Sequence, residues 1–195
     1  MIPTIKKRVI LVFCDGETEK SFLKFLGKLP RYSDLISITT EFVSGGSNHQ
    51  YFLKNCQKLY KQKKEQGKTK HVYCFIAFID SDISDLSDDP TAKKKIEAGF
   101  EAMGVTCIWK DPCFEGMLLR CLPGNETRRP VLSKNALDEV KRILDNPPFE
   151  TKYEKSISAS GLKKIISWDD VHRASQHDAD LRKLLSILDQ AAGGR

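Results

Sequence analysis

The stretch RVILVFC (residues 8–14), followed directly by DGETE (residues 15–19), decides the fold of this chain. A second stretch, HVYCFIAFI (residues 71–79), repeats the pattern and runs into Asp80-Ser81-Asp82. Short apolar runs rich in Val, Ile and Phe are typical of buried strands, and α/β proteins bind ligands beyond the carboxyl ends of their strands. Because neighbouring carboxylates repel each other unless a cation joins them, the two stretches predict a divalent-metal site.

Strand-like and helix-like segments alternate up to residue 122. The expected strands are 8–14, 36–43, 71–79 and 105–109, and the expected helices are 18–28, 48–65, 91–103 and 111–121. This alternation predicts an α/β fold in three layers, with a parallel sheet of about four strands and helices on both faces. After Leu122 the strand signal disappears. Residues 1–122 are therefore expected to form the sheet domain, and residues 123–195 a helical C-terminal extension packed on it.

A third acidic segment lies beyond the fourth expected strand. Asp111-Pro112 is predicted to open a helix, with Asp111 as the N-cap and Pro112 at the first helical position. Glu115 is then the fourth helical residue, just above the exit of the strand. The acids also have ordinary structural explanations, since carboxylates favour the first turn of a helix and Asp and Ser favour strand-ending turns.

The charge distribution mildly favours an anionic partner. The 195 residues include 32 Lys and Arg against 26 Asp and Glu, which gives a net charge of +6 and a pI near 8.9. Basic residues crowd at 58–70, 93–95 and 128–129, whereas acids crowd at 80–89. A negative pocket rimmed by basic surface suits a metal site that receives a phosphodiester, and solvated helix faces are the alternative explanation.

The cysteines and the apolar runs point to a cytoplasmic protein. None of the six cysteines forms a C-x-x-C pair, which argues against both a zinc site and a disulfide framework. The first apolar run stops at Asp15 with no cleavage site after it, and no run approaches the roughly 18 apolar residues of a membrane span. No membrane partner is expected.

One further segment has the composition of a phosphate-binding turn. Ser44-Gly45-Gly46-Ser47-Asn48 precedes a helix whose free N–H groups could hold a phosphate, but it lacks the spacing of a P-loop. An ordinary turn between a strand and a helix is the simpler interpretation. His49 beside it is expected either at the surface or in contact with a phosphate.

Three motifs in order resemble the RloB-like proteins, a branch of the Toprim superfamily. They are CDGETEKSF (residues 14–22), FIDSD (78–82) and DPCFEGMLLRCL (111–122), and the resemblance covers about residues 8–122. It implies a Toprim fold with strand order 2-1-3-4, which would make residues 1–122 a catalytic domain. It also implies a nuclease that uses Mg²⁺ or Mn²⁺ to hydrolyse phosphodiester bonds of DNA or RNA. RloB-like proteins are associated with bacterial restriction and anti-phage loci, including abortive infection.

The resemblance assigns roles by position. Asp80 and Asp82 match the D-x-D metal ligands, and Asp15 stands where the superfamily has its first catalytic Glu. Glu19 and Glu115 match further acids of the pattern, as a base or as support for the metal ligands.

Two departures from the family pattern bear on activity. Asp15 is one methylene shorter than Glu, so its oxygen lies about 1.5 Å further back, against Mg²⁺–oxygen distances of about 2.0–2.1 Å. Asp111 replaces the usual Asn and adds a negative charge.

Two other classes of function remain open. The short Asp15 suits a non-catalytic Toprim-like module that binds nucleic acid or a nucleotide and regulates a partner ATPase. The apolar residues within 168–188 suit a structural subunit that forms a homo-oligomer through its helices. No tyrosine lies at a recognisable strand-exchange position, so a topoisomerase is not expected.

Overall fold

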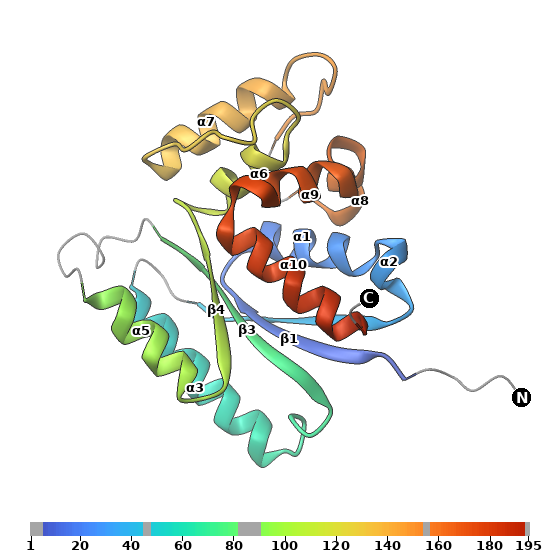
Figure 1. Ribbon diagram of the computed structural model, residues 1–195. Coiled ribbons are helices and arrows are strands. Elements are labelled where there is room, and N and C mark those ends of the chain that lie inside the picture. The colour runs from blue at the N-terminus through green and yellow to red at the C-terminus, as the bar shows by residue number, and fades with distance from the viewer. Residues whose placement is uncertain (1–5, 45–47, 82–90, 154–156, 194–195) are drawn as a thin grey trace, which may run out of the picture.

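Four parallel strands form a single sheet in the order β2-β1-β3-β4 (Figure 1). They are β1 (Arg8–Cys14), β2 (Ile36–Phe42), β3 (Val72–Asp80) and β4 (Val105–Lys110). The computed structural model describes residues 6–44, 48–81, 91–153 and 157–193. The predicted α/β fold and its strand order are confirmed. β3 and β4 each extend one residue beyond their expected ends, which makes Asp80 and Lys110 the last residues of their strands.

β1 is buried on both sides, because its successive side chains point to opposite faces of the sheet and helices cover both faces. In β1, Ile10 and Val12 join one apolar cluster, whereas Leu11 and Phe13 join another. None of the four is more than 4 % exposed. The continuous apolar sequence of the strands reflects this two-sided burial.

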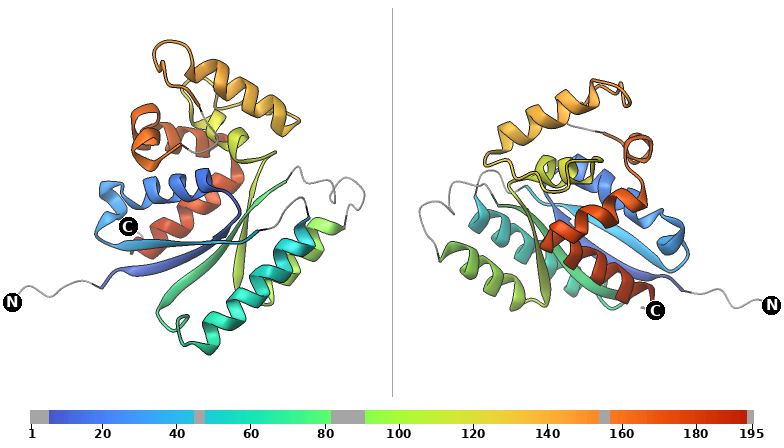
Figure 2. Two further views of the ribbon diagram at one scale, coloured as in Figure 1. Left: turned by 180° about the vertical axis from the view of Figure 1, so that it is seen from behind. Right: turned by 45° about the horizontal axis from the view of Figure 1, so that its top comes forward.

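Two helices cover one face of the sheet, namely α3 (His49–Glu65) and α5 (Ala92–Glu101) (Figure 2). Phe52 of α3 and Phe100 of α5 lie in the same apolar cluster as Leu11 and Phe13. Gly99 permits the close approach of the two helices, since a Cβ atom there would lie 2.5 Å from Leu53 Cδ2.

The other helices build the opposite face and the region above the carboxyl edge of the sheet. They are α1 (Glu17–Gly27), α2 (Pro30–Ser33), α6 (Phe114–Cys121), α7 (Ser133–Leu144), α8 (Ala159–Ile165), α9 (Trp168–His177) and α10 (Ala179–Ala192). Leu184 and Leu188 of α10 are fully buried in the same apolar cluster as Val12 of β1 and Phe78 of β3. The helices after residue 122 therefore complete the core of the sheet. Among the described residues, no helix has both the length and the apolar character needed to cross a membrane.

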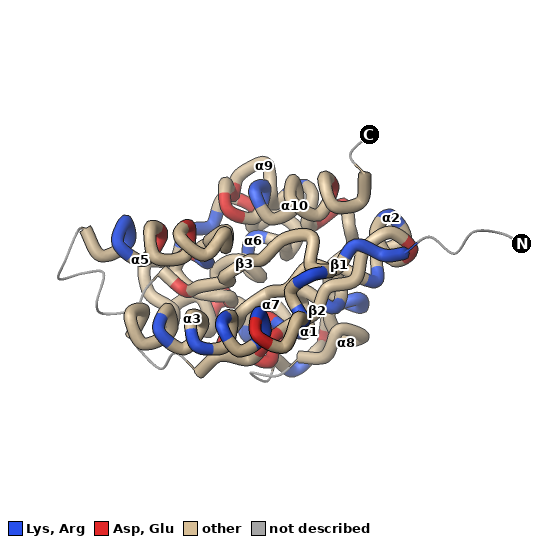
Figure 3. The backbone as a smooth tube through the Cα atoms, turned by 90° about the horizontal axis from the view of Figure 1, so that it is seen from below, with Lys and Arg blue, Asp and Glu red and all other residues tan. Residues whose placement is uncertain are grey.

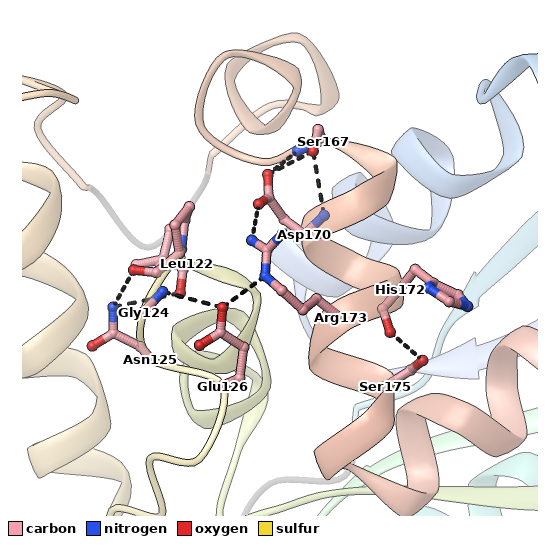
Figure 4. Close-up of polar contacts among 10 residues, drawn as sticks. Leu122, Gly124, Asn125, Glu126, Ser167, Asp170, His172, Arg173 and Ser175 are labelled. Carbon is pink, nitrogen blue, oxygen red and sulfur yellow. Dashed lines mark hydrogen bonds and ion pairs between the residues drawn. The ribbon is translucent and has the colours of Figure 1, made fainter.

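The turn after Leu122 is anchored to α9 (Figure 4). Asn125 Nδ2 donates a hydrogen bond of 3.4 Å to the carbonyl oxygen of Leu122, and Glu126 Oε1 accepts one of 2.8 Å from Arg173 Nε. Arg173 also pairs with Asp170 of its own helix. These contacts fix the path of the chain between the sheet and the C-terminal helices.

The start of α6 differs from the expectation. The prediction that Asp111 is the N-cap is wrong, because the helix begins at Phe114 with Cys113 as its N-cap. The Asp111–Pro112 peptide is cis, and Cys113 is extended, with φ −150° and ψ −175°. The backbone N–H of Ser81 donates a hydrogen bond of 2.9 Å to the carbonyl oxygen of Pro112. That contact ties the segment to the end of β3, so Glu115 becomes the second helical residue instead of the fourth.

Candidate metal centre

Three carboxylates meet at the carboxyl edge of the sheet. Asp15 directly follows β1, Asp80 ends the neighbouring strand β3, and Glu19 lies in the first turn of α1. One oxygen atom of each lies within 4.8 Å of those of the other two. The carboxyl ends of adjacent parallel strands share one edge, which is why residues 65 positions apart in the sequence can meet here.

A buried lysine lies among these carboxylates. Lys110, the last residue of β4, is 0 % exposed, and its Nζ lies 2.7 Å from Glu19 Oε1 and 2.8 Å from Asp80 Oδ1. Asp15 Oδ1 is more distant, at 3.6 Å. Three carboxylates thus face one ammonium group, and two negative charges have no counter-ion among the described residues.

Two carboxylate oxygens are left without hydrogen bonds. Asp15 Oδ1 and Asp80 Oδ1 are shielded from solvent and accept no hydrogen bond from the described part of the chain. Lys110 Nζ forms an ion pair with Asp80 Oδ1 at 2.8 Å. The two Asp side chains as a whole are each 24 % exposed, so other atoms of these side chains face solvent.

The electrostatics reflect this excess of negative charge. Burial raises the pKa of Asp80 to about 6, although the nearby Lys110 acts to lower it. Burial also raises the pKa of Asp15, again against the effect of Lys110. For Lys110, burial alone would lower the pKa, but the charges of Asp80, Glu19 and Asp15 outweigh it and raise the pKa above its ordinary value. The lysine is therefore charged at neutral pH, while the carboxylates lack full compensation.

Glu19 reaches this position by folding back over Gly16. Gly16 is the N-cap of α1 and makes no side-chain cap. A Cβ atom on Gly16 would lie only 1.8 Å from Glu19 Oε2. The glycine therefore makes room for the carboxylate that binds Lys110, and its role in the motif is steric.

His49 supports the end of β3 from the opposite face of the sheet. Its side chain is 1 % exposed, and Nε2 lies 2.9 Å from the carbonyl oxygen of Asp80. Its ring packs edge-on against Trp109, with ring centroids 5.4 Å apart. The expectation that His49 lies at the surface is wrong, and the alternative of a phosphate contact stays a prediction. Of the predicted phosphate-binding turn, residues 45–47 lie outside the described residues, and Asn48 caps α3.

Glu115 does not join the three carboxylates within the described part of the chain. Its carboxylate accepts hydrogen bonds from Cys113 Sγ at 3.3 Å and from the Tyr153 hydroxyl at 3.4 Å. Burial, together with the charge of Glu115, raises the pKa of Tyr153. Glu115 therefore has a local structural role in this arrangement.

Two further predicted residues belong to the segments that follow β3 and β4. Asp82, the second carboxylate of the D-x-D motif, lies outside the described residues. Asp111, the residue that departs from the family pattern, accepts a hydrogen bond of 3.1 Å from Ser81 Oγ. Its carboxylate is therefore held next to the end of β3.

Sequence reasoning missed Lys110 and Tyr153. The signal for Lys110 was its position directly after the apolar segment VTCIW (residues 105–109), where a charged residue at a strand end faces the same edge as Asp80. Tyr153 lies between two helices in a segment without periodic pattern, and no local signal indicates its burial.

A search of protein-family models, curated proteins and solved structures found no match to this chain. The fold and the site thus define an α/β protein with a parallel four-stranded sheet and a buried acidic centre that could bind a metal ion. The resemblance to the RloB-like proteins stays a prediction.

Proposed function

We propose that this chain is a Mg²⁺-dependent nuclease that hydrolyses phosphodiester bonds at the centre formed by Asp15, Glu19 and Asp80. The observation that carries the proposal is the charge count: among the described residues, three clustered carboxylates face a single buried ammonium. One divalent cation would balance the two remaining negative charges. Mg²⁺ and Mn²⁺ both bind carboxylate oxygens of this kind.

The donor set fits such an ion. Asp15 Oδ1 and Asp80 Oδ1 are buried and accept no hydrogen bond in the described part of the chain, and they share one ammonium group, Lys110 Nζ, at 3.6 and 2.8 Å, so a cation held by these two side chains would add to an incomplete charge compensation. Both side chains remain partly exposed, which allows water to complete the coordination that Mg²⁺ prefers. Asp82 is a further proposed ligand on the strength of its D-x-D spacing.

We assign a separate role in the proposed reaction to each residue of the centre. Asp15 and Asp80 would hold the ion, while Lys110 fixes the orientation of Glu19 and Asp80 from inside the protein. When bound, Mg²⁺ polarises a phosphoryl oxygen and activates water. We assign to Glu19, whose carboxylate lies within 4.8 Å of the other two, the role of a base that would accept a proton from the attacking water.

A cleavage assay tests this function. The purified chain is incubated with labelled single-stranded DNA, duplex DNA and RNA in Mg²⁺, in Mn²⁺ and in EDTA. We expect metal-dependent cleavage that Asp80→Asn abolishes and that the exposed control Asp138→Asn retains. Absence of cleavage under every condition, or equal cleavage by Asp80→Asn, would contradict the proposal.

Lys110 itself favours a second candidate function. A fully buried ammonium that already contacts all three carboxylates can act as a permanent counter-ion, and it would then make the centre structural. The chain would in that case be a non-catalytic module that binds nucleic acid or a nucleotide and regulates a partner protein such as an ATPase. Metal binding separates the two candidates, since a structural centre takes up no divalent ion.

The cellular setting follows from the same reasoning. We propose that the protein acts in the cytoplasm, because all six cysteines are free and five of them are buried as small apolar side chains. The RloB-like motifs and the strand order expected of a Toprim fold support a role in anti-phage defence. Phage challenge of cells that carry the wild-type or the Asp80→Asn protein would test that role.

A further inference from the structure

We propose that the exposed face of α3 binds single-stranded nucleic acid and leads it toward the acidic centre. The face consists of Tyr51, Lys54, Lys58 and Lys61, and we call it the α3 face. This inference rests on the proposed function for the destination of the strand, but the binding surface itself stands on separate observations.

The helical period places these residues in one row. Positions 51, 54, 58 and 61 are separated by three or four residues, which is the spacing of neighbours on one side of a helix. All four side chains are exposed, whereas Phe52 and Cys56 point into the core. At a rise of 1.5 Å per residue, the row is about 15 Å long.

No described residue neutralises the charge of the row. Lys54, Lys58 and Lys61 have no ion-pair partner among the described residues, whereas Lys63 of the same helix pairs with Glu41 at 2.6 Å. Glu65, the last residue, is the only acid within α3. Figure 3 shows basic positions recurring along this helix. A row of free ammonium groups is the charge pattern that complements a phosphate backbone.

The row begins at the end of the helix nearest the acidic centre. His49, the first residue of α3, contacts the carbonyl oxygen of Asp80 at 2.9 Å, so α3 starts at the carboxyl edge of the sheet. Tyr51 follows in the first turn, where its backbone N–H is fixed by a hydrogen bond of 2.8 Å to Asn48 Oδ1. Its side chain is 55 % exposed.

An exposed aromatic ring beside lysines favours a single strand over other anionic partners. Unpaired bases stack on aromatic side chains while lysines follow the backbone. A membrane surface would also attract the lysines, but stable binding needs an apolar face as well, and the apolar face of α3 is buried in the core.

Binding measured in EDTA tests this surface without cleavage. The probe is a fluorescent single-stranded oligonucleotide, and the readout is anisotropy over a range of salt concentrations. The variant Lys54→Gln/Lys58→Gln/Lys61→Gln keeps the helix-forming stems and removes three charges. The matched control, Lys24→Gln/Lys28→Gln/Lys164→Gln, removes three exposed charges on α1, its C-cap and α8, beyond the opposite face of the sheet.

The α3 variant should bind the oligonucleotide at least tenfold more weakly, and its salt dependence should fall by roughly 0.7 for each phosphate that it no longer neutralises. Tyr51→Ala should weaken single-strand binding roughly tenfold and duplex binding much less. Equal losses of affinity in the α3 variant and the control would contradict the proposal, as would stronger binding to anionic vesicles than to the oligonucleotide. If the α3 face binds but no cleavage occurs, the binding surface stands and the nuclease function fails.

Discussion

Lys110 Nζ lies 2.7 Å from Glu19 Oε1, and this fully buried contact joins the end of β4 to the first turn of α1. The contact lies at the carboxyl edge of the sheet, where Asp15 and Asp80 also lie. A buried charge is expensive unless it is paired, so the lysine and the carboxylates each make the burial of the other tolerable. The centre consequently links β4 to α1, and among the described residues it also carries an excess of negative charge.

Removing the ammonium should destabilise the fold. Lys110→Met leaves three clustered carboxylates without a positive charge, and we expect a loss of about 3–5 kcal/mol in unfolding free energy at pH 7. Urea denaturation measures it, with the exposed Lys94→Met as control. The loss should shrink at pH 4.5, where Asp80, whose pKa is about 6, is protonated. An equal loss at both pH values would show that altered packing, and not charge, is responsible.

Asp80 should make the protein less stable as the pH rises. Its pKa is about 6 in the folded protein against 3.8 ordinarily, so the folded state binds more protons between these two values. The contribution of Asp80 to stability is therefore present below about pH 4 and lost by about pH 6, and it amounts to at most about 3 kcal/mol. Unfolding free energies of the wild type and Asp80→Asn across this range measure it. Parallel pH profiles for the two proteins would contradict the assignment.

Gly16→Ala should disturb the centre through Glu19. The new Cβ would lie 1.8 Å from Glu19 Oε2, so the carboxylate must leave Lys110 or the backbone must shift. We expect a loss of about 1–3 kcal/mol, typical of overpacking, by urea denaturation. A double-mutant cycle provides the control: in a Glu19→Ala background the same substitution should cost clearly less. If the losses of unfolding free energy from Gly16→Ala and Glu19→Ala are strictly additive, Gly16→Ala does not act through Glu19.

The C-terminal helix α10 should contribute to stability as part of the core. Leu184 is fully buried against the sheet, and Leu184→Ala should lower the unfolding free energy by about 2–5 kcal/mol. The neighbouring exposed Ser186→Ala serves as control and should change it little. If the two variants have similar stability, α10 is not an integral part of the sheet's core.

The sequence predicted those features that depend on local pattern. Continuous apolar runs placed β1 and β3 within a residue of their observed bounds, and the strand ends then placed Asp15 and Asp80 at one edge. Glu19 followed from its place in the first turn of the next helix. These positions need only periodicity and the topology of parallel strands.

Features that depend on tertiary contacts were not predictable in this way. The segment before α6 is tied to the end of β3 by a hydrogen bond from Ser81 to Pro112, which are far apart in sequence. The Asp-Pro pattern, which often marks a helix start, therefore predicted the start of α6 too early. The inward direction of Lys110 depends on three carboxylates that only the fold assembles. For the same reason the sequence could predict an acidic cluster but not that an internal cation already balances part of its charge.

The most direct test of the account is a titration of the purified chain with Mn²⁺ at pH 7.5, with free Mn²⁺ measured by electron paramagnetic resonance. We predict one ion bound per chain, at least tenfold weaker binding by Asp80→Asn, and competition by Mg²⁺. The exposed control Asp138→Asn should bind as the wild type does. No saturable binding by the wild type, or equal binding by Asp80→Asn, would contradict a metal centre at Asp15, Glu19 and Asp80.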